Sequence, residues 1–291
     1  MKNSQIYIVL IGVMLLWGVN VSALKVLVDH FAPITITAVR IFTAASMVFI
    51  ILFSMKKIRL PHREEWGLVI GGAFTGVVAH HYFLSDGLGK TSAANGGLIL
   101  GLGPLLTAVL SVIILKEKLT IWRLSGFLLG GIGVGFTVLA GSGGLGEVSI
   151  GDMEILLAIL SQAFSFIIIK KASEKMDARL LTGYMLLIGS LFLLLIALWK
   201  EPNGITSLRT GSISIWLIFL FSALFATAIG HMVYNSMIQK IGAGLFLGEK
   251  LLPAHFIGLI FIVLGVSLGS GALEYYMRSM RKMGTEDKGV E

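Results

Sequence analysis

The chain has no cysteine and little charge. Because none of the 291 residues is a cysteine, disulfide bridges and thiolate metal sites are excluded. Only 13% of the residues are charged, whereas soluble domains carry about 25%. Hydrophobic residues make up 56% of the chain, and a soluble fold of this length could not bury them, because much of its surface must face water. The composition therefore predicts a protein that folds in the lipid bilayer.

The interiors of the long apolar runs contain no acidic residues. A spanning helix needs about 20 mostly apolar residues, and such runs lie at 5–28, 33–54, 66–88, 92–115, 122–141, 152–172, 180–199, 212–238 and 252–273. Backbone groups in lipid must be paired internally, so the runs predict helices. Intramembrane catalysis needs clustered acids, nucleophiles or metal ligands. We therefore expect no enzyme activity, no cofactor and no metal site.

Positive charge is distributed unevenly among the linkers between the runs. The formal net charge is +7. The linkers after the second, fourth and sixth runs hold Lys56, Lys57, Arg59, Arg63, Lys116, Lys118, Arg123, Lys170, Lys171, Lys175 and Arg179, whereas those after the first, third, fifth and seventh runs hold Lys25, Lys90, Lys200 and Arg209. This bias predicts a cytoplasmic N-terminus in a multi-pass protein of the cell (inner) membrane. It explains the basic charge better than a nucleic-acid partner does.

The two halves of the sequence resemble each other. Three residues recur at an offset of 150, namely His81, Lys90 and Ala93 as His231, Lys240 and Ala243. Two recur at an offset of 145, namely Lys25 and Thr37 as Lys170 and Thr182. The first copy contains five runs, so the second enters the membrane inverted. We predict an all-α polytopic membrane protein with repeats at 5–141 and 152–273, and a cytoplasmic tail at 274–291. Such repeats hold substrate where they meet.

The second copy is shorter than the first. Leu115–Leu119 resembles Leu247–Leu251 at an offset of only 132, so 18 residues are missing after Ala243. That length is about one crossing, and the second repeat therefore lacks one helix. Nine crossings would place the C-terminus outside, whereas the basic tail favours the cytoplasm. A lost helix and a short irregular crossing within 241–251 both stay open.

Polar side chains inside the runs are the candidates for a substrate site. An ionisable group is costly in lipid and marks a functional site by default. Arg40 could hold a substrate carboxylate, pair with a helix end or reach the interface. The histidines could carry protons, or could be packed against backbone carbonyls. Pro104 could break the fourth span at binding depth, or only kink it. The candidates are Trp17, Asn20, Arg40, His80, His81, Tyr82, Asn95, Gln162, His231 and Tyr234.

Several motifs resemble those of the EamA type within the drug/metabolite transporter superfamily. The first span reads Leu16-Trp17-Gly18-Val19-Asn20, and Pro33 and Arg40 follow in the second. The third and fourth spans join through 87–94, and the fourth contains Gly103-Pro104-Leu105-Leu106-Thr107. Lys116-Glu117-Lys118-Leu119 follows, with Glu249-Lys250-Leu251 as its repeat.

The resemblance covers about residues 5–273. It implies ten helices and a secondary transporter that exports small metabolites such as amino acids or drug-like compounds, often driven by an ion gradient. Protons as the coupling ion and a homodimer are left open. The missing ninth helix departs from the family pattern, because that helix helps to line the family's central cavity. A non-transporting remnant of such a transporter is therefore the alternative.

Overall fold

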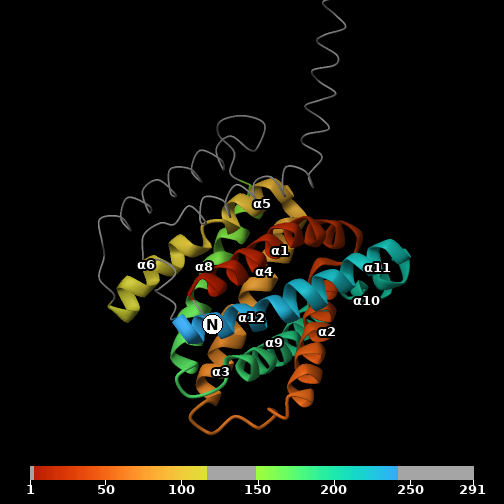
Figure 1. Cartoon of the computed structure of the whole chain (residues 1–291). Coiled ribbons are helices and arrows are strands. Elements are labelled where there is room, and N and C mark those ends of the chain that lie inside the picture. The colour runs from red at the N-terminus through yellow and green to blue at the C-terminus, as the bar shows by residue number, and fades with distance from the viewer. Residues whose placement is uncertain (1–2, 117–148, 242–291) are drawn as a thin grey trace, which may run out of the picture.

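The computed structural model describes residues 3–116 and 149–241 (Figure 1). Every regular element in these two ranges is helical. Seven helices are long and apolar enough to cross a membrane, and they coincide with seven of the nine predicted runs. The runs at 122–141 and 252–273, the tail at 274–291 and the shortened segment after Ala243 lie outside the described residues. The chain is therefore an all-α polytopic membrane protein, as predicted.

Four spans come from the first half of the chain. The first two are α1 (Asn3–His30) and α2 (Pro33–Ser54). The third span is one continuous path made of α3 (Trp66–Ala73), the π-helix η1 (Phe74–Ala79) and α4 (His80–Lys90). The fourth is divided into α5 (Ala93–Leu100) and α6 (Gly103–Leu115).

Three spans come from the second half. The first two are α8 (Ile150–Ala172) and α9 (Ala178–Lys200). A connection containing α10 (Gly204–Ser207) and the 3₁₀ turn η2 (Leu208–Thr210) follows α9. The last described span combines α11 (Ile213–Leu220), the π-helix η3 (Phe221–Ile229) and α12 (Gly230–Ile241).

Local sequence signals explain where several of these helices begin. Pro33 occupies the first turn of α2, where its missing N–H costs nothing. Ser149 and Asp152 form a reciprocal capping box at the start of α8. Ser92 caps α5, and Asp177 caps α9. The chain therefore satisfies the first backbone N–H groups of these helices near the ends of the spans.

The fourth span is broken and not merely kinked. Gly101 and Leu102 separate α5 from α6, and Figure 1 shows the two as distinct helices. Pro104 stands in the first turn of α6. Because proline has no N–H, the carbonyl of Leu100 loses the partner that a continuous helix would supply. The interruption therefore leaves the Leu100 carbonyl without its helical partner inside the membrane-spanning region, while Gly101 and Leu102 keep right-handed helical dihedrals.

The helices of the two halves interleave. Among the described elements, α2 packs along α9, with Ile41, Leu52, Leu181 and Leu186 buried in one core cluster. The third span packs on α8, and the last described span packs on α1 (Figure 1). Each half therefore contributes to the environment of the other's polar residues.

Close backbone approach is required where α4 meets α8. A Cβ on Gly87 would lie 2.8 Å from the Gly151 carbonyl oxygen, and a Cβ on Gly151 would lie 2.7 Å from that of Gly87. Two facing glycines thus allow these helices to touch through their backbones, as small residues do between membrane helices.

The two π-helices end at corresponding positions. η1 ends at Ala79 and η3 at Ile229, which differ by the offset of 150 found in the sequence. The spans that contain them begin near Trp66 and Trp216, at the same offset. This agreement supports the repeat, although its inverted arrangement stays a prediction.

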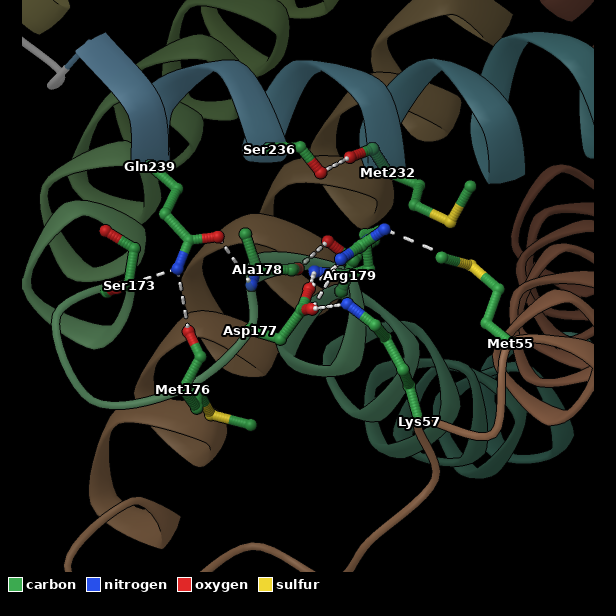
Figure 2. Close-up of polar contacts among 11 residues, drawn as sticks. Met55, Lys57, Ser173, Met176, Asp177, Ala178, Arg179, Met232, Ser236 and Gln239 are labelled. Carbon is green, nitrogen blue, oxygen red and sulfur yellow. Dashed lines mark hydrogen bonds and ion pairs between the residues drawn. The ribbon is translucent and has the colours of Figure 1, made fainter.

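Polar contacts join the loops at one end of the molecule, here called the basic end (loops 55–65 and 173–177). Asp177 accepts hydrogen bonds from Arg179 and Lys57, and those from Arg179 hold the pKa of this carboxyl well below its usual range. Figure 2 shows that Gln239 of α12 lies against the α8–α9 turn. Its amide accepts from the Ala178 N–H and donates to the Ser173 and Met176 carbonyls.

A second ion pair fixes the start of α3 at the same end. The Arg59 guanidinium donates to both carboxylate oxygens of Glu65, at 2.7 and 2.6 Å, and the His62 N–H adds a third bond. The hydrogen bonds from Arg59 lower the pKa of Glu65 to about 2. The Tyr184 hydroxyl of α9 donates to the Arg59 carbonyl, so the pair also links α9 to this loop.

Candidate functional site

A cavity of about 140 Å³ lies between helices of both halves. Its walls come from α1, α2, α4, α5, α6, α8, η3 and α12. Most of the wall is apolar, and the polar groups converge from several helices. Such a cavity suits a small ligand that is held by a few well-placed polar contacts.

Eight of the ten predicted candidates line this cavity: Trp17, Asn20, Arg40, His80, His81, Gln162, His231 and Tyr234. Tyr82 lies elsewhere, with its ring 5.0 Å from the Lys200 ammonium and its hydroxyl accepting a hydrogen bond from it. Asn95 is buried in the first turn of α5, where its backbone N–H donates to Ser92. The structure thus separates these two residues from the cavity group.

Arg40 is the buried cation of the site. It is only 2% exposed, two turns into α2. One terminal nitrogen donates to the Thr227 hydroxyl at 2.5 Å, and the other lies 3.5 Å from His81 Nδ1. Its Nε has no partner among the described residues. These contacts therefore do not show the pairing of Arg40 with a helix end, which the sequence left open.

The π-helix η3 explains how Thr227 can accept from Arg40. The Thr227 hydroxyl donates to the carbonyl of Ser222, five residues earlier, at 2.8 Å. That spacing follows the wider turn of a π-helix, a feature often found at functional sites. With its proton used in this bond, the Thr227 oxygen presents a lone pair to the guanidinium. The unusual turn therefore orients the hydroxyl beside the charge.

The three histidine rings line the cavity side by side, in the order His80, His81 and His231. The rings of His80 and His81 are 4.7 Å apart, and those of His81 and His231 are 5.9 Å apart. His80 Nδ1 lies 2.9 Å from the Ala158 carbonyl oxygen, and His231 Nδ1 lies 3.0 Å from that of Thr227. Two of the three thus show the carbonyl contacts that the sequence left as one alternative. His81 instead faces Arg40.

An aromatic wall connects α1 with the last described span. The Trp17 ring packs at a tilt against those of Tyr234 and His231, with centroid distances of 4.9 and 5.0 Å. Its indole N–H donates to the Ala226 carbonyl of η3 at 2.9 Å. Trp17 therefore ties the first helix to the π-helix that carries Thr227.

Residues at corresponding repeat positions meet in this cavity. Five pairs of lining residues stand at the sequence offsets of 145 or 150: Met14/Ile159, Trp17/Gln162, Val21/Phe166, His81/His231 and Leu84/Tyr234. Arg40 is matched by Met185, which does not line the cavity. The walls are thus related by the repeat, while the fixed charge among the described lining residues comes from the first half.

Sequence reasoning did not single out several lining residues. Thr227 is a lone hydroxyl in an apolar run, and only its place one turn before His231 could have indicated it. Apolar residues such as Leu84 and Phe166 line the cavity, yet lipid-facing positions have the same hydropathy. Pro104, which the sequence did indicate, lines the cavity together with Gly101.

Comparison with known proteins identifies the family. The model of the EamA-like transporter family matches residues 4–139 and 149–245. The chain belongs to this family. It is 29% identical to the uncharacterized transporter YyaM of Bacillus subtilis, over 94% of this chain and 96% of that protein. A chloroplastic WAT1-related protein of Arabidopsis thaliana is 28% identical over 78% of this chain and 55% of that protein.

A solved structure agrees with the fold of this EamA-like protein. One crystal structure superposes with a TM-score of 0.63 at 18% identity, covering 94% of this chain and 100% of the other. At that identity the likeness shows the fold alone. Together, the family match and the seven apolar helices show a multi-pass membrane protein of a transporter family.

Proposed function

We propose that the chain is a secondary transporter that exports small metabolites, such as amino acids or drug-like compounds, across the cell membrane. The observation that carries this proposal is the cavity, where polar groups from both halves converge inside the membrane-spanning region. Intramembrane polar residues mark substrate and ion pathways. No ATP-binding P-loop occurs in the sequence, so ATP-driven transport would need another subunit.

The arrangement of the halves supports alternating access. Substrate sites of repeat transporters lie at the repeat interface, near broken helices. Here the related wall positions, the broken fourth span and the two π-helices all border or adjoin the cavity. We propose that the two repeats, 5–141 and 152–273, rock about this site and expose it to each side in turn.

Basic residues support a cytoplasmic N-terminus. The basic end holds Lys57, Arg59, Arg63 and Lys175. Lys57 donates to Asp177 and Lys175 donates to Glu64, so contacts join the two loops. At the opposite end, Lys25 and Lys90 form ion pairs with acidic neighbours. The surplus of positive charge at one end favours the cytoplasm there.

Flux across proteoliposomes tests the function. Purified protein would be reconstituted and tested for uptake and efflux with a panel of amino acids, other organic acids and drug-like cations. We expect saturable flux of at least one class of compound. A change in this flux when a pH gradient is imposed across the membrane would show proton coupling. A well-folded preparation that moves no member of the panel would favour the non-transporting alternative.

A further inference from the structure

We propose that Arg40 and His81 form a site for the carboxylate of a small organic acid, and that the acid binds there together with one proton. The proposal rests on the proposed transport function, because it names the substrate class of the same cavity. It concerns binding, however, and can be tested without any flux.

The guanidinium of Arg40 lacks a counter-ion within the part of the chain that the structure describes. Of its five N–H donors, two point to acceptors, and both acceptors are neutral: the Thr227 hydroxyl and His81 Nδ1. A buried charge without an opposite charge is strongly unfavourable. A carboxylate matches the guanidinium fork and accepts two parallel hydrogen bonds. A carboxylate in the cavity would therefore supply the opposite charge that the described residues do not.

The rest of the wall favours an organic acid over an inorganic anion. Met14, Leu24, Leu84, Ile159 and Phe166 present apolar side chains to the cavity. An inorganic anion would lose its hydration against this surface and gain nothing from it. An apolar body attached to the carboxylate would bury its own surface there, which contributes to binding.

His81 is placed to take up a proton when the acid binds. Its Nδ1 lies 3.5 Å from an Arg40 nitrogen, so it faces a donor and must be unprotonated in that contact. A second positive charge at this distance would repel the first. A carboxylate bound to Arg40 cancels that repulsion and attracts an imidazolium instead.

The other elements around His81 supply no competing negative charge among the described residues. The charged or titratable groups around it are Arg40 from α2, His80 from α4 itself, and His231 and the Tyr234 phenol from α12. α1 and α8 contribute Asn20 and Gln162 to the cavity, and neither titrates. The loaded site, with acid anion and proton, then has the same net charge as the empty one. Both forms can therefore change conformation at a similar electrostatic cost.

Calorimetric binding to the detergent-solubilised protein tests the proposal. The probes are phenylacetate and 4-methylvalerate, each compared with its amide of the same shape. We expect the acids to bind about 10- to 100-fold more tightly than the amides, as charge-assisted hydrogen bonds imply. Titrations in two buffers of different ionisation enthalpy should show uptake of one proton per acid.

Variants identify the groups responsible. Arg40→Gln should remove the preference for acids, and Arg40→Lys should retain part of it. His81→Gln should keep acid binding and lose the proton uptake. Arg209→Gln is the matched control, because Arg209 is exposed and its side chain has no ion pair or hydrogen bond with another described residue. Should Arg40→Gln not fold, the acid and amide comparison on the unaltered protein still decides.

Three results would contradict the proposed carboxylate site. Equal affinity for acid and amide, no binding of either acid, or acid binding without proton uptake would overturn the proposal. Acid binding with proton uptake but without flux in proteoliposomes would leave the site intact and remove the proposed transport function.

Discussion

At the scale of the residue, the polar groups inside the spans divide into two classes. Some join helices away from the cavity: Asn235 donates to the Thr182 hydroxyl at 2.9 Å, across α12 and α9. Others line the cavity, such as Asn20 and Gln162. The sequence shows both classes as polar residues in apolar runs, so only the packing of the helices can separate them.

Trp17 combines both roles, and its hydrogen bond can be removed alone. Trp17→Phe keeps an aromatic ring beside Tyr234 but loses the bond to the Ala226 carbonyl. We expect a loss of about 1 kcal/mol in the free energy of unfolding and reduced flux, since η3 is no longer tied to α1. Thermal unfolding in detergent and flux measure the two effects. An unchanged flux in Trp17→Phe would contradict the role of this bond in the transport cycle.

The Arg59–Glu65 pair gives a pH-dependent prediction at the basic end. The folded pKa of Glu65 is about 2, below its ordinary value of 4.5, so its stabilisation is present above pH 4.5 and is lost as the pH falls toward 2. We expect Glu65→Gln to be less stable by about 1 kcal/mol at neutral pH, because Arg59 is partly exposed and the pair is screened.

The same comparison at low pH provides the control. The difference in melting temperature between the unaltered protein and Glu65→Gln should shrink steadily between pH 4.5 and 2. A difference that stays constant over this range would show that ionisation of Glu65 does not stabilise the start of α3.

At the scale of the element, the sequence predicted the spans well and their interiors less well. Runs such as 33–54 coincide with α2 (Pro33–Ser54), because the length of an apolar run follows the thickness of the bilayer. The two π-helices were not predicted. Phe221–Ile229 is uniformly apolar except for Ser222 and Thr227. Its hydropathy therefore does not distinguish a π-helix, with hydrogen bonds between residues five apart, from an α-helix, with hydrogen bonds between residues four apart.

The α4–α8 contact gives a prediction for the packing of these elements. Gly87→Ala places a Cβ 2.8 Å from the Gly151 carbonyl oxygen, and the helices must separate. We expect a loss of about 1–3 kcal/mol in unfolding free energy, measured by thermal unfolding, with reduced flux. Gly67→Ala is the matched control, since nothing lies within 4 Å of its added Cβ. Equal stability of the two variants would contradict the need for close approach.

At the scale of the whole molecule, the repeat in the sequence predicted that both halves would form one site. The pairs His81/His231 and Trp17/Gln162 line one cavity at the predicted offsets. The position of Arg40 beside Thr227 could not be predicted, because 187 residues separate them and the repeat does not relate them. The inverted arrangement and a homodimer stay predictions.

The orientation of the molecule can be tested with single cysteines, because the chain has none of its own. Arg63→Cys marks the basic end, and Asn203→Cys marks the connection after α9; both positions are exposed. In intact cells, a membrane-impermeant maleimide should label position 203 at once and position 63 only after permeabilisation. The reverse pattern would place the N-terminus outside and refute the charge argument.

The most direct test of the central claim is to fill the cavity. Gly101 lines it, with a backbone φ of −59° that other residues also adopt, so Gly101→Trp should fold and occupy the space. Gly12→Trp is the control, since nothing lies within 4 Å of an added Cβ there. The compound identified by the transport panel would be measured in proteoliposomes of both variants. We predict that Gly101→Trp abolishes flux while Gly12→Trp preserves it; flux at the unaltered rate through folded Gly101→Trp would show that the substrate passes elsewhere.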